Sequence, residues 1–205
     1  MLRPTINVPS SSIKLTPPDA QGQPSSTAGE REIVITSSNE SGHADARTRT
    51  VRWSDPSLGA SAAKEMAGLD YLQAIVRGEI ARAPMAELMG YSLTEASHGR
   101  AVVEIDPGEQ HYNQIGSVHA ALASALLDSA MGSAVLSTLP AGTGYTTVEL
   151  HVHLVRAITA ATPRLRCIGE VVHSGSRMAT AEARLLDQDG RLYAQGTETC
   201  LLMGS

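Results

Sequence analysis

One carboxylate lies in the middle of the longest stretch of small and apolar residues in the sequence. The stretch runs from 111 to 139, and Asp128 is its only acidic residue. Burying a carboxylate among Ala and Leu costs free energy unless hydrogen bonds compensate for it. A carboxylate in such a place is a candidate general base or nucleophile. The alternative is an acid that caps or bridges structure at a dimer seam, and the residues alone leave both interpretations open.

The residues before Asp128 predict an electrophilic helix start. Residues 118–139 are long enough for a helix of about 30 Å. The preceding loop begins at Asn113, and Gly116 permits an unusual backbone angle there. The first N–H groups of the helix, near His119 and Ala120, lack partners within the helix and are suited to stabilising an oxyanion. His119 is interpreted as a hydrogen-bonding support for this loop.

The spacing between the helix start at His119 and the carboxylate of Asp128 predicts a dimer. His119 and Asp128 are nine residues apart, which in a helix is about 13 Å of rise and about half a turn of rotation. One small carbonyl group cannot meet both positions on the same helix. If both act on one substrate atom, they come from two antiparallel copies of the helix, with two sites per dimer.

The elements around this helix follow from periodicity. Leu69, Leu72, Val76 and Ile80 have helical spacing, and Pro84 and Gly90 are suited to begin and end a second, short helix. In the run after Gly144, every second residue from Val148 to Leu154 lies on one face of the predicted strand. Every second residue from Thr147 to His153 lies on the other face. The expected strands are 91–96, 100–106, 145–156, 165–173, 178–186 and 192–202.

Four consecutive strands with short turns predict an antiparallel meander. The predicted fold class is α+β: a curved antiparallel sheet of five to six strands wrapped around one long central helix, with N-terminal helices. The end strands of such a sheet are open edges, which favours pairing with a second copy.

Composition restricts the partners and divides the chain. The 205 residues carry 16 basic and 21 acidic side chains, a net charge of −5, and no basic stripe, so no nucleic acid is expected. Residues 1–60 are rich in Ser, Thr, Pro and Gly and predict a disordered extension, leaving 61–205 as the domain. No secretory signal is apparent, and the apolar stretch is interpreted as a buried helix. We expect a cytoplasmic protein without membrane contact.

Metal and redox chemistry find little support. Cys167 and Cys200 are far apart in strand-like runs without a CxxC motif, so both are interpreted as buried thiols. His151 and His153 share a strand face, but a zinc site needs three or four ligands. We therefore expect neither a metal nor a cofactor.

The pattern Asn113-x-x-Gly116-x-x-His119-x8-Asp128 resembles the signature of PaaI-type (phenylacetate-pathway) acyl-CoA thioesterases, which have the hotdog fold. The resemblance covers roughly residues 68–203. It also includes 68–72, 147–150, 155–156, 172–177 and 189–192. Residues 47–56 are similar to the usual start of such proteins, so 1–45 would be an added extension.

The resemblance implies hydrolysis of an acyl-CoA or aryl-acyl-CoA to free acid and CoA in a homodimer or homotetramer. Asp128 would activate water or attack directly, and the Ala120 N–H of the partner subunit would polarise the carbonyl. Asn113 would orient the thioester or the water, and Thr147 would assist the water. One departure is His119-Ala120-Ala121, where the family usually has His-Gly-Gly, because the added methyl groups narrow the approach to the N–H.

Cations at turns would suit the phosphates of CoA. The best candidate is Arg177 beside Gly175 and Ser176, and Arg156 is the second; Gly116 belongs to the same expected binding surface. Two other functions remain open. One is a hotdog dehydratase acting on 3-hydroxyacyl thioesters, and the other is a non-catalytic acyl-CoA-binding or dimerisation module. A further possibility is that residues 1–45 dock a partner protein.

Overall fold

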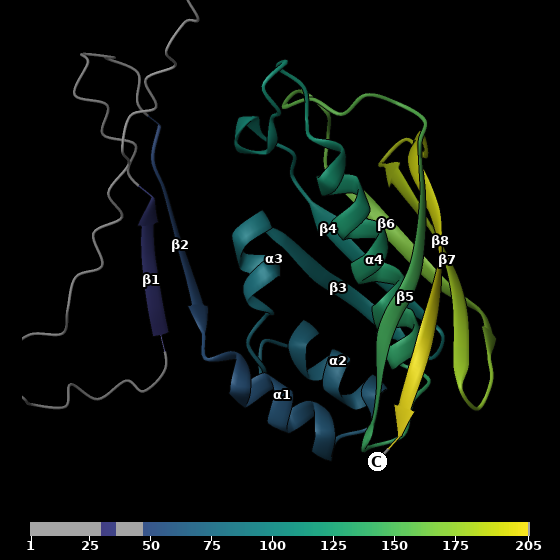
Figure 1. Ribbon diagram of the computed structural model, residues 1–205. Coiled ribbons are helices and arrows are strands. Elements are labelled where there is room, and N and C mark those ends of the chain that lie inside the picture. Colours follow the sequence, from purple (N-terminus) through teal and green to yellow (C-terminus); the bar gives the residue numbers. More distant parts are fainter. Residues whose placement is uncertain (1–29, 36–46, 205) are drawn as a thin grey trace, which may run out of the picture.

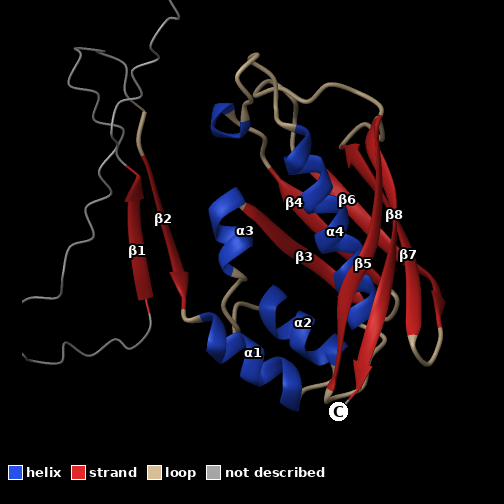
Figure 2. Ribbon diagram, in the orientation of Figure 1, coloured by secondary structure: helices blue, strands red, loops and turns tan. Residues whose placement is uncertain are grey.

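A six-stranded antiparallel sheet wraps around one long helix, α4, as Figures 1 and 2 show. The computed structural model describes residues 30–35 and 47–204. The predicted architecture is confirmed. The elements are β1 Glu30–Ile35, β2 Arg49–Ser54, α1 Pro56–Glu65, α2 Gly68–Val76, α3 Pro84–Met89, β3 Tyr91–Ser97, β4 Arg100–Ile105, the short 3₁₀-helix Glu109–His111, α4 Ala120–Leu136, β5 Thr143–Leu154, β6 Leu165–Ser174, β7 Met178–Asp187 and β8 Leu192–Gly204.

The strand order is β3-β4-β6-β7-β8-β5, so the predicted meander is correct only for β6 to β8. The strand β5 does not pair with β6; it pairs with β8 at the far edge of the sheet. The distance to be crossed is three strand spacings, about 14 Å. The connection 155–164 is long enough for that crossing, and it carries the chain from the edge strand β5 to β6.

The core lies between α4 and the concave face of the sheet. Leu127 and Met131 of α4 are fully buried, together with Leu122, Leu126 and Val135. Both cysteines are free and buried, and burial raises the pKa of each thiol. With no Phe in the chain, a core of Leu, Val, Ala and Met requires the helix to approach the sheet closely.

The short helix before the sheet has the predicted ends. The helix α3 begins at Pro84 and is closed by Gly90, whose φ of +82° is the left-handed conformation that favours glycine. Neither feature needs tertiary contacts, which is why the sequence alone identified both.

The described part of the predicted extension forms regular structure, with β1, β2 and the start of α1 before residue 61. The strand β2 pairs with β1, and Val51 is buried. Arg49 Nη2 donates a hydrogen bond to the Glu87 carbonyl oxygen at 3.3 Å, which attaches β2 to α3. Composition missed this because one buried valine suffices to dock a short strand. Residues 1–29 and 36–46 of the predicted extension lie outside the described residues.

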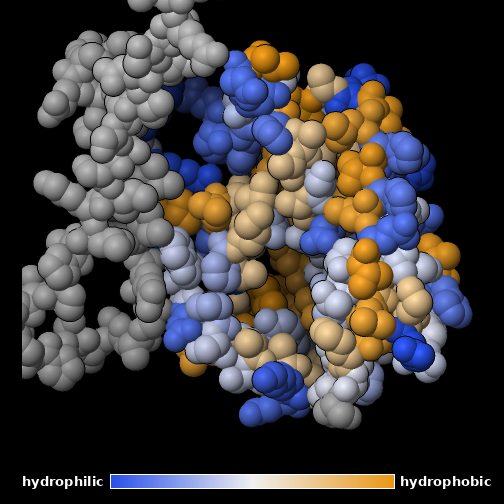
Figure 3. All heavy atoms as spheres, viewed as in Figure 1, coloured by the Kyte–Doolittle hydropathy of each residue, from blue (hydrophilic) through white to orange (hydrophobic). Residues whose placement is uncertain are grey.

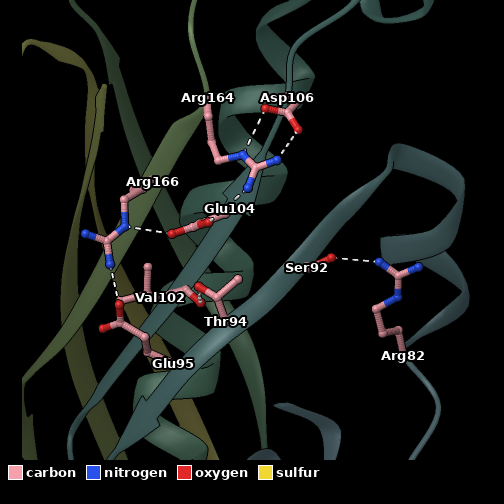
Figure 4. A network of polar contacts seen from close by, with 9 residues as sticks. All are labelled: Arg82, Ser92, Thr94, Glu95, Val102, Glu104, Asp106, Arg164 and Arg166. Carbon is pink, nitrogen blue, oxygen red and sulfur yellow. Dashed lines mark hydrogen bonds and ion pairs between the residues drawn. The ribbon is translucent and has the colours of Figure 1, made fainter. Parts of the chain in front are cut away.

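The outer face of β3, β4 and β6 carries a network of ion pairs (Figure 4). Arg166 donates to Glu104 at 2.7 Å and also to Glu95, while Arg164 binds both oxygens of Asp106, with Nε to Oδ1 at 2.9 Å. Such exposed pairs add little to stability but favour one strand register. Arg164 and Arg166 therefore form ion pairs on the side of the sheet away from α4.

We predict that Gly169→Ala destabilises the fold. A Cβ at this β6 position would lie 2.4 Å from both the carbonyl carbon and the oxygen of Ala130, and the α4 backbone cannot move aside as a side chain can. Overpacking of this kind costs about 1–3 kcal/mol in the free energy of unfolding. Urea unfolding followed by circular dichroism measures it.

The matched control is Gly144→Ala in β5, where an added Cβ meets nothing within 4 Å. Its effect should stay within about 0.5 kcal/mol. Equal stabilities of the two variants would contradict the close approach of α4 to β6.

Candidate active site

Asp128 lies in the middle of α4 on the side that turns toward β5. It is half-buried, and its Oδ1 accepts a hydrogen bond from Thr147 Oγ1 at 3.2 Å. The Thr147 hydroxyl is the only side-chain donor to Asp128 that the described residues provide. The structure thus brings together two of the predicted site residues, from elements 19 positions apart in the sequence.

A β-bulge in β5 determines where Thr147 points. Thr147 is opposite Cys200 and Glu149 is opposite Thr199, so Val148 is an extra residue without a partner across the ladder. Val148 is 54% exposed, whereas Leu150 packs against the core on the same side as Thr147. The predicted alternation was therefore wrong at this point, because strict alternation does not allow for the bulge.

A second acid, Glu198 of β8, lies directly behind Thr147 and was missed from the sequence. Its side chain is 2% exposed, and its Oε1 is 2.8 Å from Thr147 Oγ1 and 2.9 Å from Cys200 Sγ. Among the described residues, its Oε2 has no hydrogen-bond partner. Loss of water raises the pKa of Glu198, and the nearby charge of Asp128 raises it further. The signal in the sequence was an acid at an inward position of the alternation Ala194, Gly196, Glu198, Cys200.

Two tyrosines complete this part of the site. Tyr91 shares a hydrogen bond with Ser129 Oγ at 2.9 Å, one residue beyond Asp128. The ring of Tyr145 lies against Gly132, where an added Cβ would be 2.2 Å from the tyrosine oxygen. Burial raises the pKa of both phenols, so both are neutral at physiological pH.

The loop before α4 is held by its own asparagine. Asn113 Oδ1 accepts hydrogen bonds from the backbone N–H groups of Ile115 at 3.0 Å and Ser117 at 3.2 Å, and its Nδ2 donates to Ser117 Oγ at 3.0 Å. Gly116 has a φ of +82°, the unusual angle that the sequence predicted. The amide of Asn113 thus shapes the loop and keeps one N–H for other contacts.

His119 caps α4. Its Nδ1 accepts a hydrogen bond from the Ala121 N–H at 3.0 Å, so in the neutral ring Nε2 carries the proton. Ala120 follows as the first helical residue; it is exposed, and no partner for its N–H occurs among the described residues. A free N–H at the positive end of a helix can donate to a developing oxyanion.

A cleft of about 330 Å³ joins the helix start to one of the predicted arginines. Asn113, His119, Ala120 and Arg156 all line it. The Arg156 guanidinium lies 5.8 Å from the centre of the Tyr193 ring, a cation–π distance. A second cleft of about 440 Å³, lined by Arg49, His111 and His119 among others, lies between β2 and the same helix start.

The predicted turn Gly175–Arg177 is at the other end of α4 within one chain. The Val171 N–H donates to the Gly99 carbonyl oxygen, and the Gly99 N–H donates to Ser137 Oγ at the end of α4. The turn follows that end of β6 (Figure 1), whereas Arg156 lines the cleft at the start of α4 together with Ala120. In one subunit the two predicted CoA-binding regions are therefore separate.

The described residues contain no cluster of three or more potential metal ligands. His151 is exposed, and its Nε2 is 3.0 Å from Glu149 Oε1. Within residues 30–35 and 47–204, none of the helices has both the length and the hydropathy needed to span a membrane.

The comparisons with known proteins place this arrangement in a family. A family model for the thioesterase superfamily matches residues 115–194. A solved structure of a thioesterase superfamily protein is 33% identical, covers 65% of this chain and 97% of its own, and has a TM-score of 0.53. This chain belongs to the thioesterase superfamily. The hotdog fold is thereby confirmed, with the concave sheet around one helix as its defining feature.

Two further structures support the resemblance to PaaI-type members of the superfamily. A thioesterase family protein from Silicibacter pomeroyi is 28% identical, covers 65% of this chain and 99% of its own, and has a TM-score of 0.58. A phenylacetic acid degradation-related protein from Ralstonia eutropha JMP134 is 25% identical, with coverages of 64% and 98% and a TM-score of 0.57. Among curated proteins, none matches the sequence significantly.

We predict that His119→Ala destabilises α4 in this superfamily member. The substitution removes the acceptor for the Ala121 N–H, and loss of such an N-cap costs about 1 kcal/mol. His119→Asn keeps an acceptor at this position and should retain most of the stability. Thermal unfolding of the two variants measures the difference; similar losses for both would show that the cap contributes nothing.

Proposed function

We propose that this protein hydrolyses the thioester bond of an acyl-CoA or aryl-acyl-CoA, at sites formed between two antiparallel copies of α4. The observation that carries the proposal is Asp128: a half-buried carboxylate, hydrogen-bonded by Thr147, on a helix of the thioesterase superfamily. Ala120 and Asp128 are eight residues apart, about 12 Å along α4, so the donor and the base of one chain cannot meet at one carbonyl.

The exposed side of α4 supports a paired arrangement. The sheet covers one side of the helix, whereas Ala121 is exposed and Ser124, Ala125 and Asp128 are only half-buried. Small side chains on that side allow a second helix to approach closely. Figure 3 shows a hollow bordered by hydrophobic surface between the helices α2 and α3 and the strand β5.

The free edge of the sheet supports the same conclusion. The strand β5 is an edge strand, and Val148 at 54%, Leu154 at 55% and Val155 at 55% are exposed on it or directly after it. Exposed apolar edge strands are sites of pairing between chains. We infer a homodimer, alone or as half of a homotetramer.

The proposed reaction uses Asp128 of one subunit as the base and the Ala120 N–H of the partner subunit as the oxyanion donor. Asp128 takes a proton from a water molecule, which attacks the carbonyl carbon of the thioester; direct attack by the carboxylate is the other route, and both need the ionised acid. The oxyanion accepts a hydrogen bond from Ala120 of the partner subunit. The C–S bond then breaks, the acid product leaves, and the CoA thiolate takes up the proton that Asp128 had received.

The supporting groups have narrower roles. Thr147 holds Asp128, and Asn113 maintains the loop that presents the Ala120 N–H. Arg156, at the cleft beside Ala120, is placed to bind a phosphate of CoA, and Gly175, Ser176 and Arg177 would contribute from the other end of a paired helix. Ala120 is exposed and its N–H has no partner among the described residues, so the change from the usual glycine is compatible with this role.

Asp128→Asn should lower kcat for acyl-CoA hydrolysis by about 10²–10⁴-fold, because the amide cannot accept the proton from water. A thiol-release assay across acyl chain lengths and aromatic acyl groups measures the loss and identifies the preferred acyl class. The matched control is Asp70→Asn on the exposed surface of α2, which should retain wild-type turnover. Unchanged hydrolysis by Asp128→Asn would refute the proposed role.

Ala120→Pro tests the shared site, since proline is well tolerated at the first position of a helix but has no N–H. His119 has a φ of −64° and a ψ of 137°, which suits a residue before proline. Alone, Ala120→Pro should lower kcat by about 10²–10³-fold.

Equal co-expression of the Ala120→Pro and Asp128→Asn chains should recover about a quarter of wild-type activity. Half of the dimers are then mixed, and each mixed dimer has one intact site out of two. Activity no higher than that of the separate variants would show that the site lies within one chain.

A further inference from the structure

Two carboxylates share one hydroxyl group at the centre of the site. Thr147 Oγ1 is 3.2 Å from Asp128 Oδ1 and 2.8 Å from Glu198 Oε1. A hydroxyl has a single proton and can donate it to only one of the two acids. If both acids were ionised, one carboxylate would face the hydroxyl oxygen with no proton between them. The arrangement is satisfied when one acid keeps its own proton.

We propose that Glu198 is that acid, and that it acts as a positioning residue by donating its proton to Thr147 Oγ1 and thereby directing the Thr147 proton to Asp128. The hydrogen bonds then run in one direction from Cys200 through Glu198 and Thr147 to Asp128. The effect on turnover rests on the proposed function, whereas the protonation of Glu198 does not.

Among the described residues, none of the groups that act on Glu198 carries a positive charge. Asp128 faces it from α4, Tyr145 and Thr147 from β5, and Cys200 from its own strand, while Ala181 is its partner on β7. Every one of these groups is neutral or acidic. Burial without a cation raises the pKa of Glu198, and the charge of Asp128 acts in the same direction.

The unpartnered oxygen of Glu198 supports the same assignment. Oε1 has contacts with Thr147 and Cys200, whereas Oε2 is buried without a partner among the described residues. An ionised carboxylate with a dry, unpaired oxygen is far more costly than the carbonyl oxygen of a neutral acid. The proton therefore belongs on Oε1, which is the oxygen that faces Thr147.

The two acids differ in what surrounds them. Asp128 is half-buried on the open side of α4, so water and the Thr147 hydroxyl can stabilise its charge. Glu198 faces the core. With Thr147 directed to Oδ1, the second oxygen of Asp128 stays available for the attacking water.

Ionisation of Glu198 would reverse the direction of the hydrogen bonds. The carboxylate would draw the Thr147 proton across the shorter contact, and Asp128 would lose its donor and gain a negative neighbour. Because folding raises the pKa of Glu198, this acid contributes stability that is complete below its unfolded pKa and is lost as pH rises through its folded pKa. Activity should fall over the same range, as pH rises through the folded pKa of Glu198.

The test compares Glu198→Gln and Glu198→Leu with the wild type in full pH profiles of kcat for acyl-CoA hydrolysis. Gln presents an N–H to Thr147 at every pH, so this variant should lack the fall in kcat that the wild type shows as pH rises through the folded pKa of Glu198. Leu removes the group that orients the Thr147 hydroxyl, and kcat should drop about two- to tenfold, as expected for one lost hydrogen bond between neutral groups. The matched control is Glu182→Gln, an exposed position on the neighbouring strand β7, which should keep the wild-type profile.

A second measurement does not depend on catalysis. Infrared difference spectra of Glu198→Gln against wild type at neutral pH should show loss of the carbonyl band of a protonated carboxylic acid. The urea midpoint of the wild type should fall with rising pH over the window where that of Glu198→Gln stays level. Loss of a carboxylate band instead would overturn the proposal, even if hydrolysis were confirmed. If the same fall of kcat with rising pH persists in Glu198→Gln, the positioning role is overturned.

Discussion

The hydrogen bond between Thr147 and Asp128 is the contact on which the site depends. Asp128 lies in a helix composed almost entirely of Leu, Ala, Met, Val, Gly and Ser, where an acid without a donor would be costly. Thr147 can provide the donor only because β5 lies beside β8, at the edge of the sheet that curves around α4. The bulge at Val148 then turns the hydroxyl inward. Topology and one irregular residue therefore act together to make a buried acid possible.

Close packing sets the second constraint. Gly169 allows the backbone of α4 to approach β6, and Gly132 leaves room for the Tyr145 ring. Both contacts lie on the sheet side, and they hold the helix firmly enough to fix the direction of Asp128. The opposite side of α4 carries mostly small residues that the described chain covers only in part, with Ala121 exposed and Ser124 and Ala125 half-buried. A helix that is apolar on all sides is normally buried on all sides, which agrees with the paired assembly proposed for the site.

Most of the fold could be predicted from local patterns, and the exceptions have physical reasons. Pro84 and Gly90 mark the ends of α3 because their backbone preferences are local, and a lone acid in an apolar run identified Asp128 without any knowledge of its contacts. The place of β5 could not be predicted, because edge pairing depends on which strand is free after the others have paired. The bulge was missed because alternation is a rule about regular strands. The docking of β2 was missed because it depends on tertiary contacts of Val51 and Arg49.

Glu198 shows a different limit. Its inward position was present in the sequence, but an inward acid in a strand has meaning only when its partner is known, and Thr147 is 51 residues away. Once β5 and β8 are known to lie side by side, the single proton of the Thr147 hydroxyl determines how the two acids can be charged. One hydroxyl cannot serve two ionised acids, so their different surroundings must give them different charges. The acid on the open side of α4 can remain a base, and the acid in the core can remain a donor, which assigns two roles to two carboxyl groups that the sequence alone would treat as equivalent.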